Sequence, residues 1–167
     1  MISTTERPRG ATTPWSPLKS IVVGGFLAGL ADFTYAMVYF GGIKGAPPIK
    51  IWQSVAAGLI GTSSYDGGTA TFVLGLGLHW LIAFIWATVF VFVATRFLPS
   101  LLRRPIPYGL AYGAFVYGWM NYVVLPLDAM HTHVHYIPLT WWTGLAVHMF
   151  GIGLAISLSA AKTAPRA

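Results

Sequence analysis

The sequence contains no cysteine, and this absence removes several classes of protein at once. Disulfide frameworks, thiolate metal sites, iron–sulfur clusters and haem attached through thioether bonds all require cysteine sulfur. Acidic residues are also scarce, because 4 aspartate and glutamate residues stand against 10 lysine and arginine residues. Any metal or haem would therefore have to be held by histidine or by one of the few carboxylates.

Charged residues of both signs make up only 8% of the 167 residues, whereas hydrophobic residues make up 56%. Soluble domains usually carry about 25% charged residues. The mean hydropathy of +0.67 points the same way. So few charges cannot cover the surface of a soluble protein of this length, and we expect a single integral membrane domain.

The isoelectric point of about 9.8 and the net charge of +6 do not indicate nucleic-acid binding. The basic residues stand in small groups beside apolar segments, where lysine and arginine set membrane topology. The sequence has no basic–aromatic surface pattern, no nucleophile elbow, no phosphate-binding glycine loop and no zinc-protease motif. We therefore reject nucleic acid as a partner and favour a protein that is not an enzyme.

Four apolar stretches are long enough to cross a bilayer, which takes about 20 residues in a helix. They predict an all-α, integral membrane four-helix bundle over residues 19–161, with cytoplasmic tails on either side, the first of them disordered. The predicted spans are residues 21–40, 69–98, 108–125 and 139–160, and the predicted tails are residues 1–18 and 162–167.

A shorter apolar stretch at residues 51–60 lies between the first and second spans. It is bounded by the turn-rich residues 41–50 and by a polar run, and it is too short to cross the bilayer. We predict a short helix here. The pattern leaves open whether this helix is interfacial, re-entrant or packed on the bundle.

Basic residues before the first apolar run are also typical of a secretory signal. A signal has an apolar core of about 7–15 residues and then a small-residue cleavage site. The run here is longer and continues through Tyr35 and Tyr39. We therefore favour an uncleaved first span.

The distribution of lysine and arginine predicts the orientation. In a four-span topology only Lys44 and Lys50 fall on one side of the membrane. The other side holds Arg7, Arg9, Lys19, Arg96, Arg103, Arg104, Lys162 and Arg166. Basic loops stay in the cytoplasm, so both termini are predicted to be cytoplasmic, with the chain in the inner (plasma) membrane.

Each long apolar stretch carries one side chain that lipid solvates poorly, and small residues share its helical face. The four are Asp32, His79, Asn121 and His148. At 1.5 Å per residue, His79 and His148 lie roughly 15 Å below the outer surface, Asp32 about 12 Å and Asn121 about 7–8 Å. We predict that the four line one outward-facing pocket between the helices.

Three chemistries suit such a pocket, and a purely structural role competes with them. Two imidazoles and a carboxylate could bind a divalent transition metal or relay protons. His79 and His148 could be axial ligands of haem, although membrane cytochromes with two haems need more histidines. The same side chains could instead bond one another and Asn121 and so lock the bundle.

A second cluster, in the loop before the fourth span, consists of Asp128, His131, His133 and His135. Histidines at alternate positions share one side of an extended segment, so the loop could bind zinc or copper. A solvated loop at the lipid headgroups is the competing interpretation. Trp52, Trp141 and Trp142 fit interface anchors.

Two stretches resemble a family of small multi-pass bacterial inner-membrane proteins, some of them grouped as YagU-like. The first stretch runs from Ile51 to His79 and the second from Met120 to Leu127. The resemblance as a whole covers roughly residues 19–126. The resemblance implies a helical membrane protein and no particular activity.

The sequence thus predicts a polytopic membrane protein that transports or senses a small solute, protons or a metal through the polar pocket. The alternatives are a metal- or haem-binding redox protein and an accessory or scaffold subunit of a membrane complex. Four spans leave little room for a full transport path, which favours a homodimer or a complex with a partner.

Overall fold

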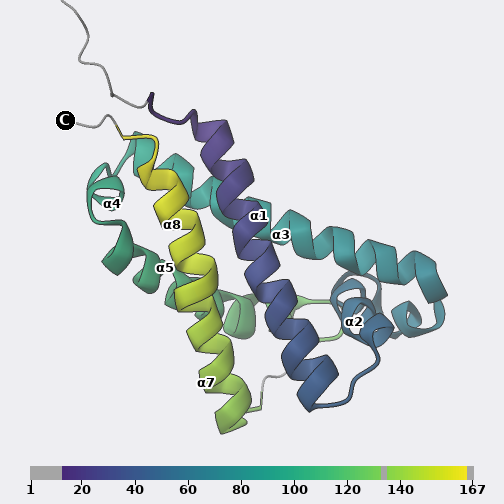
Figure 1. The fold of residues 1–167 in the computed structure, drawn as a ribbon. Coiled ribbons are helices and arrows are strands. Elements are labelled where there is room, and N and C mark those ends of the chain that lie inside the picture. The colour runs from purple at the N-terminus through teal and green to yellow at the C-terminus, as the bar shows by residue number, and fades with distance from the viewer. Residues whose placement is uncertain (1–12, 133–134, 165–167) are drawn as a thin grey trace, which may run out of the picture.

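The computed structural model describes residues 13–132 and 135–164, and all regular elements in these ranges are helical. Four helices are long and apolar enough to cross a membrane, namely Pro17–Ile43, Gly68–Arg96, Pro105–Leu127 and Pro138–Ala161. The prediction of an all-α, integral membrane four-helix bundle is confirmed (Figure 1).

Three of the four spans change from α-helix to π-helix along their length, and only the second span is a single α-helix, α3 (Gly68–Arg96). The first span joins α1 (Pro17–Ala36) to η1 (Met37–Ile43). The third joins α5 (Pro105–Trp119), η3 (Met120–Val124) and α6 (Leu125–Leu127). The fourth joins α7 (Pro138–Ala146), η4 (Val147–Gly153) and α8 (Leu154–Ala161). The connections contain α2 (Pro48–Ile60), the 3₁₀-helix η2 (Gly61–Asp66) and α4 (Ser100–Arg103).

The first span is longer at both ends than the predicted residues 21–40. Ser16 caps it, since its hydroxyl accepts a hydrogen bond from the backbone N–H of Lys19 at 3.2 Å. Pro17 follows at the first helical position, where a missing N–H costs nothing. The helix therefore begins inside the predicted N-terminal tail. Residues 1–12 and 165–167 of the two predicted tails lie outside the described residues.

The packing order of the spans places α1 against both α3 and α8, while α5 packs on α8 and η4 (Figure 1). The Ser20 hydroxyl donates to the carbonyl of Ser159 at 2.9 Å, which joins α1 to α8 inside the bundle. The backbone N–H of Trp15 donates to the carbonyl of Lys162 at 2.8 Å. The first and last spans therefore begin and end on the same side of the bundle.

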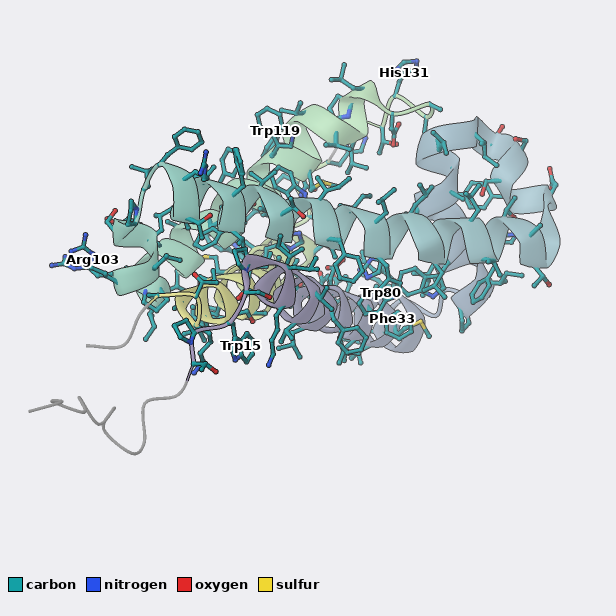
Figure 2. The ribbon with its side chains drawn as sticks, turned by 90° about the horizontal axis from the view of Figure 1, so that it is seen from above. Trp15, Phe33, Trp80, Arg103, Trp119 and His131 are labelled. Carbon is teal, nitrogen blue, oxygen red and sulfur yellow. The ribbon has the colours of Figure 1, made fainter. Side chains whose placement is uncertain are left out.

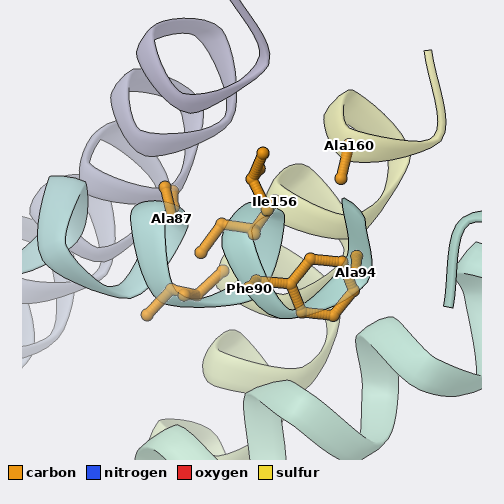
Figure 3. Packing of buried hydrophobic residues seen from close by; sticks show 8 residues of the cluster. Ala87, Phe90, Ala94, Ile156 and Ala160 are labelled. Atoms are coloured by element: carbon orange, nitrogen blue, oxygen red, sulfur yellow. The ribbon is translucent and has the colours of Figure 1, made fainter. Parts of the chain in front are cut away.

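A cluster of buried apolar side chains lies where the first, second and fourth spans meet (Figure 3). Its members come from α1, α3, η4 and α8: Ala28, Ala87, Phe90, Val91, Ala94, Ile152, Ile156 and Ala160. Lipid tails are as apolar as these side chains, so the helices gain from close contact rather than from the hydrophobic effect. Many of the members are alanines because a small side chain lets two helices approach each other closely.

The short helix α2 packs on the outer half of α3, which settles where the stretch 51–60 lies. Ala56 and Ala57 are fully buried. A Cβ atom on Gly75 of α3 would collide with the carbonyl oxygen of Trp52, so only glycine permits this approach. Gly61 ends α2 with φ 72°, in the left-handed region that favours glycine.

Candidate functional site

Asp32 on α1 and His79 on α3 face each other across the interface of the two helices. Oδ2 of Asp32 lies 3.7 Å from Nδ1 of His79. The histidine side chain is 9% exposed, whereas the aspartate side chain is 30% exposed and lines a cavity. Gly29 has no side chain, and this allows the two helices to come close here. A Cβ atom at this position would collide with the ring of Trp80.

The other ring nitrogen of His79 is committed to the backbone. Nε2 lies 2.9 Å from the carbonyl oxygen of Gly29, and a carbonyl can only accept, so Nε2 carries a hydrogen and donates it. Nδ1 is the nitrogen that faces the Asp32 carboxylate, at 3.7 Å, which is longer than a hydrogen bond.

Aromatic rings enclose this pair. The ring of Trp52, on α2, meets the His79 ring edge-on with centroids 5.0 Å apart. Phe33 of α1 stacks on Trp52 at 4.8 Å, and Trp80 of α3 contacts His79 edge-on at 5.6 Å. Phe33 and Trp80 are labelled in Figure 2. The short helix α2 therefore covers the Asp32–His79 pair with an indole.

His148 and Asn121 both lie in π-helical segments and bond to their own helices. Nδ1 of His148 donates to the carbonyl of Gly144 at 2.9 Å, and the amide of Asn121 donates to the carbonyl of Tyr117 at 2.8 Å. Each bond reaches the carbonyl four residues earlier, where the α-helix changes to the i→i+5 pattern of a π-helix. In neutral His148 this leaves Nε2 as the nitrogen with a lone pair.

Two tyrosine–threonine pairs hold the first span to the start of the fourth. The Tyr39 and Thr140 hydroxyls are 2.6 Å apart, and those of Tyr35 and Thr143 are 3.0 Å apart. Tyr35 and Thr140 also line the cavity beside Asp32. These hydroxyl pairs fix the wall of the cavity that lies opposite α2.

All four polar residues of the predicted pocket line one cavity of about 540 Å³, which we name the outer cavity. It extends from Asp32, His79, Asn121 and His148 to Ala46, Lys50 and Tyr65, which belong to the connection between the first and second spans. Because this connection lies at the end of the bundle away from the termini, the cavity opens at that end.

A smaller space of about 150 Å³, which we name the inner chamber, lies on the other side of the polar residues. Asp32, His79 and His148 line both spaces, whereas Asn121 lines only the outer cavity. The rest of the chamber wall is almost entirely apolar, consisting of Ala28, Gly29, Val55, Ile82, Ala83, Trp86, Val116, Met120 and Ile152. The polar side chains therefore stand where a wide, partly polar space meets a small apolar one.

Lys50 and Asp32 bring opposite charges to the outer cavity, but they lie at different levels. Lys50 is at the mouth, where its ammonium donates to the carbonyl of Tyr65 at 2.7 Å and lies 5.5 Å from the centre of the Tyr65 ring. Asp32 lies at the boundary with the inner chamber. The carboxylate at depth is thus separate from the ammonium at the mouth.

The predicted outer metal cluster is only partly described. Asp128 accepts a hydrogen bond from the backbone N–H of Met130 at 2.8 Å, which makes it a turn-forming side chain. His131 and His135 are exposed, and His133 lies outside the described residues. Figure 2 shows His131 projecting from the loop after α6, away from Trp80 and Phe33. A metal site in this loop stays a prediction.

No group of three or more histidine, aspartate or glutamate side chains in the described part of the chain is arranged to hold a metal ion. Haem bound by both intramembrane histidines does not fit the geometry either, because Nε2 of His79 is bonded to Gly29.

Trp52 belongs to the site, although the sequence analysis predicted it at the membrane surface. The prediction that it anchors the chain at the membrane surface is wrong, because its side chain is 2% exposed and packs beside His79. Trp142, by contrast, is 58% exposed. The clue in the sequence was the small residues Ala56 and Ala57 one turn later, which allow that face of α2 to be buried.

Comparison of the chain with protein families, with curated proteins and with solved structures found no match. The resemblance to YagU-like proteins therefore stays a prediction.

Proposed function

We propose that the protein binds a small solute in the outer cavity and acts as a transporter or sensor in a bacterial inner membrane. The observation that carries the proposal is a cavity of about 540 Å³ among membrane-spanning helices, with Asp32, His79, Asn121 and His148 in its wall. Small-molecule sites typically measure about 300–1,000 Å³ and combine apolar walls with a few polar groups. The outer cavity has that size and that composition.

The competing role, locking the helices together, accounts for only some of the polar residues. His79 forms a hydrogen bond between helices, to Gly29. Asn121 and His148 bond to their own helices, and no hydrogen bond from another described residue reaches the Asp32 carboxylate. An ionisable group inside a membrane is costly, so one that holds little together is better explained by a ligand or a proton.

The side to which the cavity opens follows from the basic residues. Arg96, Arg103 and Arg104 lie around α4, at the end of the bundle that also holds Lys19 and Lys162. Lys and Arg concentrate on the cytoplasmic side of membrane proteins. With that end in the cytoplasm, the outer cavity faces the outside of the cell and would take its solute from there.

Cysteine labelling tests whether the cavity contains water, and the natural absence of cysteine makes the experiment clean. Ala36 lines the outer cavity, whereas Val38, two residues later, is 57% exposed on the surface of the bundle. We expect Ala36→Cys to react in spheroplasts with a charged, membrane-impermeant thiosulfonate, because a thiolate forms only where water reaches it. Val38→Cys, facing lipid, is the matched control and should react far more slowly.

Equal and slow labelling of both variants would overturn the proposal, since the cavity would then be closed to water. Rapid labelling of Val38→Cys would also overturn it, because the span would not sit in lipid as described. Size-exclusion chromatography in detergent shows whether each variant is folded before the rates are compared.

A further inference from the structure

The carboxylate of Asp32 lacks hydrogen-bond donors among the described residues. Its nearest ionisable neighbour is His79, at 3.7 Å, and the side chain is 30% exposed. Among the residues that the structure describes, Asp32 is the only acidic one in the walls of the outer cavity and the inner chamber. A carboxylate at this depth is stabilised by a partner that brings positive charge and N–H groups.

The walls around Asp32 suit an organic cation better than a bare metal ion. Tyr35 and Tyr117 line the outer cavity with it. The faces of aromatic rings attract ammonium groups, most strongly where water is displaced. A metal ion would instead need several oxygen or nitrogen ligands, and no such group of three occurs in the described residues.

The inner chamber sets the size of the rest of the ligand. Its volume is about 150 Å³, and its far wall is formed by Ile82, Trp86 and Ile152 among other apolar side chains. A dry apolar cavity of about this volume accommodates one benzene ring. The chamber adjoins Asp32, so one molecule could place a charged group on the carboxylate and an apolar group beyond it.

The positive charge at the mouth does not compete for this position. The Lys50 ammonium donates to the Tyr65 carbonyl at 2.7 Å, at the mouth of the cavity. Nδ1 of His148 is occupied by Gly144 at 2.9 Å. The carboxylate that an incoming ligand meets at the boundary of the chamber is therefore that of Asp32.

We propose that the cavity binds an organic cation, namely an ammonium group that carries one ring-sized apolar substituent. The ammonium lies against Asp32 between the aromatic rings, and the substituent occupies the inner chamber. This inference rests on the proposed binding function and names its ligand class.

Three probes of similar size and different charge test the inference on the wild-type protein in detergent. They are phenethylammonium, neutral phenethyl alcohol and anionic phenylacetate, with binding followed by calorimetry. We expect phenethylammonium to bind about tenfold or more tightly than the other two, which is the usual worth of a hydrogen bond to a charged group. Methylammonium, which lacks the ring, should bind more weakly than phenethylammonium because it leaves the chamber unfilled.

Asp32→Asn keeps the shape of the side chain and removes its charge, so it should lower the affinity for phenethylammonium by about tenfold and leave that for the alcohol unchanged. Asp66→Asn, an exposed acidic residue on η2, is the matched control and should change neither. If Asp32→Asn fails to fold, the comparison of the three probes on the wild type still decides.

Preference for phenylacetate would overturn the inference in favour of an anion held by Lys50 and the histidines. Equal binding of all three probes, or binding of none, would also overturn it. If one of these results is found while the water-soluble reagent still labels Ala36→Cys, the proposed ligand class is wrong but the proposed binding function stands. If Ala36→Cys is not labelled, the proposed binding function fails as well.

Discussion

The His79 ring spans the interface of α1 and α3, with Nε2 2.9 Å from the Gly29 carbonyl and Nδ1 3.7 Å from the Asp32 carboxylate. One residue therefore joins the helices and also lies beside the carboxylate that faces the cavity. The two contacts use different nitrogens, so substitutions can separate them.

We expect His79→Ala to lower the free energy of unfolding by about 0.6–2 kcal/mol, the range found for a hydrogen bond between membrane helices. His79→Gln should recover part of the loss, because an amide N–H can still reach a backbone carbonyl. Thermal unfolding in detergent measures both. His131→Ala removes an exposed histidine and serves as the control. A stable His79→Ala variant would show that the bond to Gly29 contributes little.

Gly75→Ala should displace α2, because the added Cβ would collide with the Trp52 carbonyl. Overpacking of this kind typically costs about 1–3 kcal/mol. Gly77→Ala, two residues later on the same helix, adds a Cβ that meets none of the described atoms within 4 Å and should leave stability unchanged. Indole fluorescence reports whether Trp52 becomes exposed. Equal stability of both variants would contradict the close packing of α2 on α3.

The hydroxyl pair Tyr39–Thr140, 2.6 Å apart, should couple the first and fourth spans. We expect Tyr39→Phe and Thr140→Val each to destabilise the protein by about 1 kcal/mol. The double variant should cost less than the sum, with a coupling energy of at least about 0.5 kcal/mol. Tyr136→Phe, on an exposed ring, is the control. Strict additivity in the double-mutant cycle would show that the two hydroxyls do not interact.

Two single-cysteine variants test the orientation. Thr13 lies just before α1, at the end of the bundle that holds the termini. Ser63 is exposed on η2, between the first and second spans, at the opposite end of the bundle. We expect an impermeant reagent to label Ser63→Cys in intact spheroplasts and Thr13→Cys only after permeabilisation, because the basic end faces the cytoplasm. The reverse pattern would invert the proposed orientation. Labelling of both in intact spheroplasts would contradict the number of membrane crossings between them.

The four spans could be predicted from the sequence because a membrane helix satisfies its own backbone hydrogen bonds and needs only a long apolar run. The predicted start at residue 21 is four residues after the observed start at Pro17, because the serine cap and the proline at the first helical position were not used to place it. Helical phase placed small residues next to the polar ones, and Gly29 and Gly75 indeed lie at close approaches. These features depend on neighbours within a few turns, so periodicity reveals them.

The relation between polar side chains depended on contacts that no local pattern encodes. Depth estimates placed the four polar residues at similar levels but did not distinguish their partners. The tertiary structure pairs Asp32 with His79, while His148 and Asn121 bond to their own helices. The crossing of α1 over α3 at Gly29 and the π-helical turns decide this arrangement, and a π-turn rotates every later side chain on its helix.

The sequence by itself determined that this protein is an all-α membrane bundle of four spans, because hydropathy and length settle what can cross a bilayer. Only the tertiary structure decided that α2 packs on the bundle with Trp52 buried beside His79. It also decided that a cavity of about 540 Å³ adjoins an apolar chamber at Asp32. Cavities form where helices diverge, and that divergence depends on how side chains from distant parts of the chain fit together.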